Sequence, residues 1–155
     1  ILAALLAQVS EGVNQVNAQM VAEERGLKVK ESLERASSEN LIEVTIRGDN
    51  AESQVTGAMF GPEDARIVNL NSYRLEAVPE GHLLVVSNED VPGMIGHVGT
   101  FLGGQGVNIA QLYLSRNRKG GVALSIYQLD HQLDSTALES LSADANIRSV
   151  RQITL

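Results

Sequence analysis

The chain has 155 residues, a formal net charge of −7 and no cysteine. This length accommodates one ordinary domain or two small ones. The negative charge argues against general binding to nucleic acid or to an anionic membrane, because both need a basic surface. Without cysteine the chain has no disulfide, thiolate metal site or cysteine nucleophile, which is compatible with a reducing cytoplasm.

Neither a membrane span nor a signal peptide is predicted. No apolar run approaches the ~20 residues that a membrane helix needs. The apolar opening at residues 1–7 lacks the basic start and small-residue cleavage site of a secretory signal. The first residue is Ile1 rather than Met, so we expect a fragment whose upstream part is missing.

Residues 1–25 carry a helical pattern. Apolar residues recur at three- and four-residue steps, which predicts a helix with one covered face. These residues are Leu2, Leu5, Leu6, Val9, Val13, Val16 and Met20. We expect Gly12 to divide the segment into two helices, and Gly26 to close the second in a left-handed conformation.

After Gly26 the apolar period changes to two, which indicates half-buried strands. Strands are predicted at residues 27–29, 42–46 and 55–59, with one or two more within 66–78. The separating turns are expected at residues 36–40, 48–50 and 61–64. The Pro/Gly linker at 78–81 predicts a boundary between a domain at 1–78 and a second at 79–155.

The second half predicts the order βαββαβ. The expected segments are a strand at 82–88, a helix at 92–105, a strand at 107–116, a hairpin turn at 117–121, a strand at 122–130, a helix at 135–142 and a strand at 146–155. This order predicts a ferredoxin-like α+β fold, in which both helices cover one face of a four-stranded antiparallel sheet. The bare face commonly pairs with another subunit or domain.

The glycines between residues 93 and 106 raise the possibility of a nucleotide cradle. A dinucleotide site needs Gly-x-Gly-x-x-Gly between a strand and the start of a helix. Here Gly96 and Gly99 fall inside the predicted helix, and Gly103, Gly104 and Gly106 fall at its end. The glycines therefore favour close packing and a C-terminal turn over phosphate binding.

The start of the same helix is a candidate ligand site. Pro92 and Gly93 begin it and leave N–H groups free, where the helix dipole favours a carboxylate. Asn88 and Asp90 precede it and can bind an ammonium or hydroxyl group. Asn108 opens the next strand, and we expect it across the same edge.

A second interpretation of these polar residues stays open. Asn88 and Asp90 are also suited to capping and turn formation, and Asn108 to a left-handed turn position. The residues alone do not decide between the two interpretations.

Longer stretches resemble a known family. Residues 90–116, DVPGMIGHVGTFLGGQGVNIAQLYLSR, resemble an ACT domain, a regulatory module that senses small molecules, and in particular the C-terminal ACT domain of phosphoglycerate dehydrogenase. VNAQMVAEERGLKVKES at 16–32 and VTGAMFGPEDARIVNLNSYRLEAVPEGHLLVV at 55–86 resemble the intervening, or allosteric substrate-binding, domain that precedes it in long forms of that enzyme.

The resemblance implies an allosteric role. In that family L-serine, the end product of the pathway, binds between two ACT domains and inhibits the enzyme. The matching positions here are Asn88, Asp90 and Asn108, with backbone amides around Pro92 and Gly93. At Asn88 relatives often carry an aromatic or histidine side chain, so this position departs from the family pattern.

The resemblance also implies a second, anionic site. Some long-form members carry a basic pocket for a phosphorylated substrate or product in the intervening domain. Arg66 matches one such basic position, whereas the other two positions hold Val78 and Gln128, which carry no charge.

Catalysis is not expected within this chain. The family's catalytic histidine, carboxylate and arginine, and its NAD-binding fold, lie upstream of the regulatory region, so we expect no catalytic residue and no cofactor here. No sequence pattern joins His82, His97 and His131 into a metal site. The expected partners are L-serine and a second copy of the chain. A free-standing amino-acid sensor and a dimerisation scaffold are the alternatives.

Overall fold

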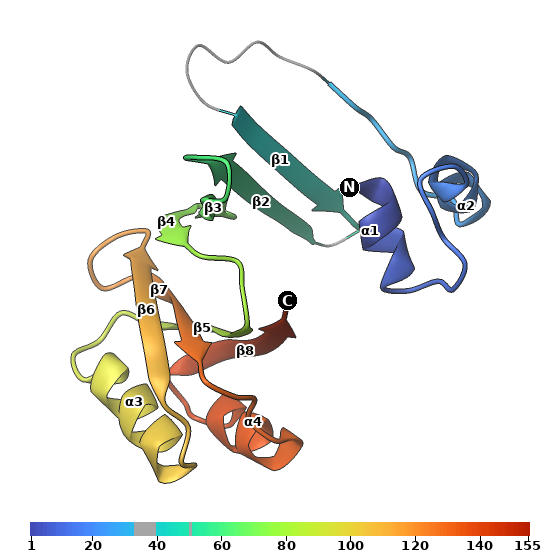
Figure 1. Ribbon diagram of the computed structural model, residues 1–155. Coiled ribbons are helices and arrows are strands. Elements are labelled where there is room, and N and C mark those ends of the chain that lie inside the picture. Colours follow the sequence, from blue (N-terminus) through green and yellow to red (C-terminus); the bar gives the residue numbers. More distant parts are fainter. Residues whose placement is uncertain (33–39, 50) are drawn as a thin grey trace. The chain divides into compact units, whose positions relative to one another are not determined.

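The computed structural model describes residues 1–32, 40–49 and 51–155, which group into two compact units, Ile1–Arg35 and Ala36–Leu155 (Figure 1). The boundary expected at residues 78–81 lies inside the second unit and stays a prediction. The first unit contains two short helices, α1 (Leu2–Ala7) and α2 (Ala18–Glu24). They meet through a small apolar cluster centred on Leu6, Ala18 and Ala22.

The break between these helices is longer than the apolar pattern predicted. Gly12 adopts a left-handed conformation with φ of 73°. The Asn14 side chain accepts hydrogen bonds from the amides of Val16 and Asn17, and the Asn17 side chain accepts one from the amide of Asn14. Asparagine side chains thereby replace the helical bonds of this segment. Val9 and Val16 are consequently exposed, so the prediction of one continuous covered face was wrong.

Gly26 ends α2 as expected, and no strand follows it. Its φ is 72°, and Leu27 donates to the carbonyl oxygen of Ala22, a bond that satisfies a free carbonyl at the helix end. The strand predicted at residues 27–29 is absent from this described segment. Two alternating apolar residues are too few to define a strand without a neighbour to pair with.

The first sheet belongs to the second unit and is antiparallel throughout. Its strands, in spatial order, are β1 (Asn40–Arg47), β2 (Glu52–Met59), β3 (Ala65–Leu70) and β4 (Tyr73–Ala77). The strands predicted at 42–46 and 55–59 are confirmed, and residues 66–78 form two strands rather than one. The turn at 61–64 is confirmed by a hydrogen bond from the backbone N–H of Phe60 to the carbonyl oxygen of Asp64. Most of the turn expected at 36–40, and residue 50 of another, lie outside the described residues.

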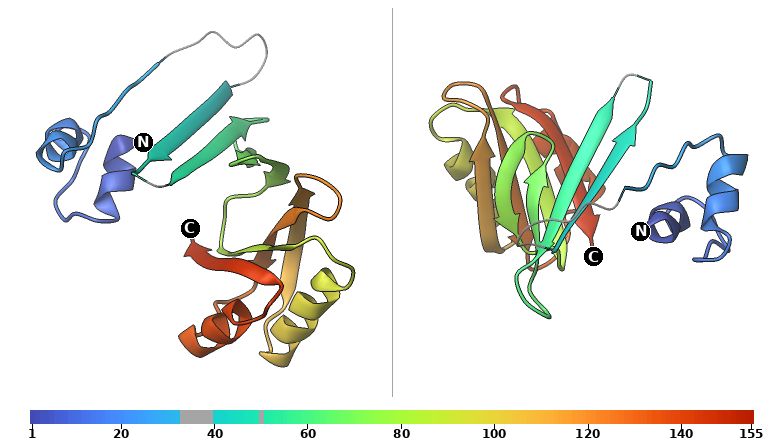
Figure 2. Two further views of the ribbon diagram at one scale, coloured as in Figure 1. Left: turned by 180° about the vertical axis from the view of Figure 1, so that it is seen from behind. Right: turned by 90° about the horizontal axis from the view of Figure 1, so that it is seen from above.

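The remaining elements form the predicted βαββαβ domain. They are β5 (His82–Glu89), α3 (Met94–Gly104), β6 (Ile109–Arg116), β7 (Val122–Leu129), α4 (Ser135–Ser142) and β8 (Ile147–Thr154). The antiparallel sheet has the order β6-β7-β5-β8. Both helices lie on one face of it, a layering that Figure 2 shows from two further sides. The ferredoxin-like fold is therefore confirmed.

One apolar core holds these two layers together. Its fully buried members include Leu84 and Val86 from β5, Val98 and Leu102 from α3, and Leu141 from α4. On α3 these residues recur every four positions, which places them on one stripe. Gly106, with φ of 71°, then reverses the chain into β6.

The opposite face of this sheet packs against β3 and β4. Ala77 at the end of β4, Leu83 on β5 and Ile126 on β7 form a second buried cluster, with Ile67 and Leu75 beside it. The expectation that the bare face would pair with another domain or subunit is met here by strands of the same chain. Among the described residues, no helix is long and apolar enough to cross a membrane.

Candidate functional site

The backbone at the start of α3 has N–H donors that lack a partner among the described residues. Gly93 is the N-cap, with φ of 94° and no capping side chain. The first helical hydrogen bond joins His97 N–H to the carbonyl of Gly93 at 2.8 Å. The amides of Met94, Ile95 and Gly96 precede it and are the orphan donors of a helix N-terminus. Pro92 lies before the N-cap rather than in the first turn. The helix therefore begins at Met94, two residues later than the sequence predicted.

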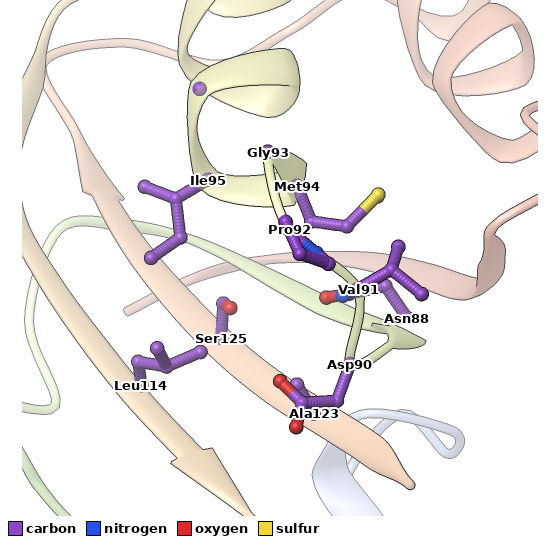
Figure 3. A pocket seen from close by; sticks show the side chains of 11 residues that line it. Asn88, Asp90, Val91, Pro92, Gly93, Met94, Ile95, Leu114, Ala123 and Ser125 are labelled. Carbon is purple, nitrogen blue, oxygen red and sulfur yellow. The ribbon is translucent and has the colours of Figure 1, made fainter. Parts of the chain in front are cut away.

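A pocket of about 370 Å³ opens beside these amides. Figure 3 shows the first turn of α3 above the strands, with Asp90, Ser125 and Leu114 around the pocket. Its other lining residues are Asn88, Val91, Pro92, Gly93, Met94, Ile95, Gly96 and Ala123. The pocket thus brings together four of the five residues predicted from the sequence.

Asp90 links the loop before α3 to the β6–β7 hairpin. Its Oδ2 accepts hydrogen bonds from the Gly120 amide at 2.9 Å and from Arg116 Nη1 at 3.1 Å. The hydrogen bond from the Gly120 N–H is the main reason that the pKa of this carboxyl lies below its ordinary value, and Arg116 lowers the pKa further by a smaller amount. Both bonds use Oδ2, so Oδ1 has no partner within the described part of the chain and is an available acceptor.

Asn88 ends β5 and is almost completely buried, with 4% of its surface exposed. Its Nδ2 donates to the carbonyl oxygen of Glu89 at 2.7 Å. This contact supports a role in shaping the turn. The side-chain oxygen of Asn88 has no partner among the described residues, so it can also accept a hydrogen bond from a ligand.

Asn108 lies at the opposite end of the sheet. Ile109 is in register with Leu129, which pairs with His82, whereas Arg116 is in register with Ala123, which pairs with Asn88. The length of β6, about 24 Å at 3.4 Å per residue, therefore separates Asn108 from the pocket. The expectation that Asn108 shares an edge with Asn88 and Asp90 was wrong within one chain.

The local role of Asn108 is also clear. Its Nδ2 donates to Asp130 Oδ2 at 3.0 Å, and Asp130 N–H donates to the carbonyl of Asn108. The left-handed turn position that precedes β6 is taken by Gly106 instead.

The charge of Arg66 is already engaged by a carboxylate. Arg66 Nε lies 2.5 Å from Asp64 Oδ1, and this contact raises the pKa of the guanidinium above its ordinary value. An anion bound at Arg66 would have to compete with Asp64. The anion site at Arg66 stays a prediction of the sequence.

Sequence reasoning missed the apolar wall of the pocket. Ile95 lies in the first turn of α3, and 46% of its surface is exposed. Val91 and Leu114 are also exposed, at 44% and 50%. The spacing of Ile95, one residue after Met94 and three before Val98, places it at the margin of the stripe and was the available signal.

The three histidines lie apart. His97 Nε2 contacts Asp144 at 2.9 Å between α3 and the end of α4, and His82 Nδ1 lies 3.0 Å from the Thr154 hydroxyl. No group of three or more His, Asp or Glu side chains is placed to hold a metal ion in the part of the chain that the structure describes.

Taken together, the fold and the pocket define a small ferredoxin-like domain with a ligand-sized site at its first helix. Residues 82–146 match the ACT domain family, and residues 1–71 match the D-3-phosphoglycerate dehydrogenase intervening domain. The chain therefore consists of an intervening domain and an ACT domain of the D-3-phosphoglycerate dehydrogenase family.

Curated relatives agree with this assignment. The chain is 35% identical to D-3-phosphoglycerate dehydrogenase of Bacillus subtilis over 96% of its own length, and 32% identical to that of Methanocaldococcus jannaschii over 93%. The enzyme of Archaeoglobus fulgidus is 34% identical over 86%. The chain spans only 29%, 28% and 26% of the lengths of these relatives.

Proposed function

We propose that this chain is the C-terminal regulatory region of a phosphoglycerate dehydrogenase, the first enzyme of L-serine biosynthesis, and that it binds L-serine between two ACT domains for feedback inhibition. In this proposal the catalytic residues and the NAD site belong to other parts of a cytoplasmic parent enzyme, and this region carries neither. The relatives' name supports the parent activity.

The observation that carries the proposal is the pairing of donors and acceptor in the α3 pocket. The free amides of Met94, Ile95 and Gly96 are suited to a carboxylate, because the helix dipole adds to their hydrogen bonds. The unoccupied Oδ1 of Asp90 is suited to an ammonium group. An α-amino acid carries both charged groups on the same carbon atom.

The free edge of β6 supports a site shared by two subunits. In the described part of the chain β6 pairs only with β7, which leaves its outer edge open. Antiparallel pairing of two β6 edges around a two-fold axis would set residue 109 of one copy near residue 116 of the other. Asn108 of each copy would then reach the α3 pocket of its partner, which accounts for the distance between Asn108 and Asp90 within one chain.

A ligand at such an interface has a direct route to regulation. Serine that contacts both copies stabilises the arrangement that brings them together, and it biases the enzyme by its different affinity for the two arrangements. Inhibition then follows from the arrangement of the subunits, and no residue of this chain has to contact the substrate.

The test is calorimetric titration of the chain with L-serine, compared with glycine and L-alanine. We expect saturable, serine-selective binding that weakens about tenfold or more in Asp90→Ala and in Asn108→Ala, as expected for loss of a hydrogen bond to a charged or polar ligand group. Because the two residues are far apart in one chain, equal losses would indicate a shared site.

Arg116→Gln is the matched control. It removes one partner of Asp90 Oδ2 but leaves Oδ1 available, so serine affinity should change by no more than a few-fold. Unchanged affinity in both Asp90→Ala and Asn108→Ala would contradict the site. Absence of binding by every amino acid in a folded dimer would instead favour a dimerisation scaffold.

A further inference from the structure

Asp130 contacts Asn108, the residue that the proposed serine site takes from a second copy. Asn108 directly precedes β6, and Asp130 directly follows β7. The first residue of β6, Ile109, is in register with Leu129, the last of β7. Asn108 Nδ2 donates to Asp130 Oδ2 at 3.0 Å, and Asp130 N–H donates to the carbonyl oxygen of Asn108 at 3.2 Å. One hydrogen bond between side chains and one between backbones therefore join the two residues.

The residues on both sides of Asn108 are anchored in the core of the domain. Val107 is 5% exposed, and its N–H donates to the carbonyl oxygen of Leu102 at 3.0 Å. Ile109 packs against the same core. The backbone of Asn108 is thereby fixed, whereas the rotation of its side chain is restricted by the hydrogen bond to Asp130.

This hydrogen bond decides which end of the Asn108 amide is free. An ionised carboxylate only accepts hydrogen bonds, so Asp130 holds the NH2 end of the amide. The amide oxygen lies on the other side of the group, and no donor within the described part of the chain contacts it. Asn108 therefore offers its oxygen, an acceptor, to a ligand.

L-serine has one polar group left for this acceptor. In the proposed site the carboxylate of serine faces the free amides at the start of α3, and its ammonium group faces Asp90 Oδ1. The hydroxyl is the remaining group, and its O–H can donate to the Asn108 oxygen of the second copy. L-alanine differs from L-serine only in lacking this hydroxyl, so it cannot make the same contact.

The charge of Asp130 is matched in a dimer that pairs through β6. With residue 109 of one copy near residue 116 of the other, the end of the sheet that holds Asp130 lies near the β6–β7 hairpin of the second copy. This hairpin carries Arg118 and Lys119, which are exposed and form no ion pair with the described residues. Two cations would thus offset the negative charge that Asp130 brings to the interface.

We propose that Asp130 is a positioning residue of the serine site. It holds the Asn108 amide with its oxygen toward the ligand, and the site thereby selects an amino acid whose side chain carries a donor hydroxyl. This inference rests on the proposed function, because it takes the site shared between two copies as given. It adds that selectivity for serine over alanine depends on a residue that does not itself touch the ligand.

The test is NMR titration of the whole chain with L-serine and with L-alanine. In Asp130→Ala the serine affinity should fall about three- to tenfold, because the freed Asn108 amide must be ordered on binding. The alanine affinity should stay within about twofold, since alanine makes no hydrogen bond to that amide. Without ligand, the side-chain NH2 signal of Asn108 should shift in the same variant. Glu139→Ala removes an equal charge from an exposed position on α4, so this matched control should change none of these results.

An exchange of the two residues tests the orientation of the amide. Asn108→Asp alone places two carboxylates against each other and should weaken serine binding about tenfold or more. Asn108→Asp combined with Asp130→Asn restores the hydrogen bond in the opposite direction and leaves a carboxylate oxygen toward the ligand. Serine affinity should then return to within about threefold of the original chain. A ligand that needed an N–H of Asn108 would not regain its affinity in this double variant.

The inference is overturned by equal losses for serine and alanine in Asp130→Ala, by no recovery in the double variant, or by loss of the dimer in Asp130→Ala, measured by sedimentation. Failure of the proposed function gives a different pattern, because Asn108→Ala would then leave serine affinity unchanged. In that case the Asn108 signal of the ligand-free chain still tests whether Asp130 orients the amide. If Asn108→Ala weakens serine binding and Asp130→Ala does not, the serine site stands and Asp130 has no part in it.

Discussion

Asp90 joins two segments that are distant in sequence. Its carboxylate contacts the hairpin through Gly120 and Arg116 while its backbone forms the loop before α3. Since these contacts hold its pKa below the ordinary 3.8, the folded state favours the ionised carboxylate. That stability is fully present above pH 3.8 and is lost as pH falls through the lowered pKa.

The variant Asp90→Asn tests this linkage. We expect it to be less stable than the original chain at neutral pH, and the difference should shrink as pH falls below 3.8. Urea unfolding at several pH values measures it. Arg116→Gln removes only the smaller cause of the lowered pKa, so it should lose part of the pH-dependent stability. A difference that stays constant with pH would contradict the linkage.

Sequence predicted the polar residues of the α3 pocket because they are local. Asn88, Asp90 and Gly93 lie within six residues of one another, around a single strand-to-helix junction. Asn108 differs, since its position depends on β6 running parallel to β5 with β7 between them. The order of strands in a sheet is set by packing across the whole sheet, so the spacing of residues along the chain does not predict which strand ends lie close together.

At the scale of elements, α4 provides a direct test of local structure. Asp134 is its N-cap, and Oδ1 accepts a hydrogen bond from the Ala137 amide at 2.7 Å. Asp134→Ala should lower the free energy of unfolding by about 1 kcal/mol, measured by urea denaturation. Asp134→Asn keeps an acceptor oxygen and should lose less than half as much. Equal losses would show that the cap bond contributes little.

The elements of the second half were predicted well because local and tertiary signals agree there. Met94, Val98 and Leu102 recur at the helical period and are all buried on one side of α3. In the first unit the apolar period crosses Asn14 and Asn17, whose side chains bind the backbone and end the helical pattern. The sequence did contain a signal for this break, namely Asn14 and Asn17 shortly after Gly12. The prediction gave more weight to the spacing of the apolar residues.

At the scale of the molecule, the two sheets each leave a strand edge open within the described residues. The outer strands are β1 and β4 in one sheet and β6 and β8 in the other. Of these, β1 exposes Ile42 and Ile46, and β6 exposes Leu112 and Leu114. An apolar open edge is a site for pairing with another chain. The sequence predicted a dimer, but the order of the strands was needed to say which edges are available.

We expect the β6 edge to form the dimer. Leu112→Lys places a charge on that edge, and a lysine on an edge strand opposes pairing with another strand. The variant should sediment as a monomer at concentrations at which the original chain is a dimer. It should also bind L-serine about tenfold or more weakly, because Asn108 of the partner no longer completes the site. Sedimentation equilibrium and calorimetry measure the two effects.

Ile46→Lys makes the same change on the open edge of β1, where 57% of the isoleucine surface is exposed. This variant should remain dimeric and bind serine normally. If Ile46→Lys dissociates the dimer and Leu112→Lys does not, the subunits join through the first sheet, and Asn108 cannot belong to the site. If both variants stay dimeric while serine affinity falls in Leu112→Lys alone, pairing through β6 forms part of the ligand site without holding the dimer together.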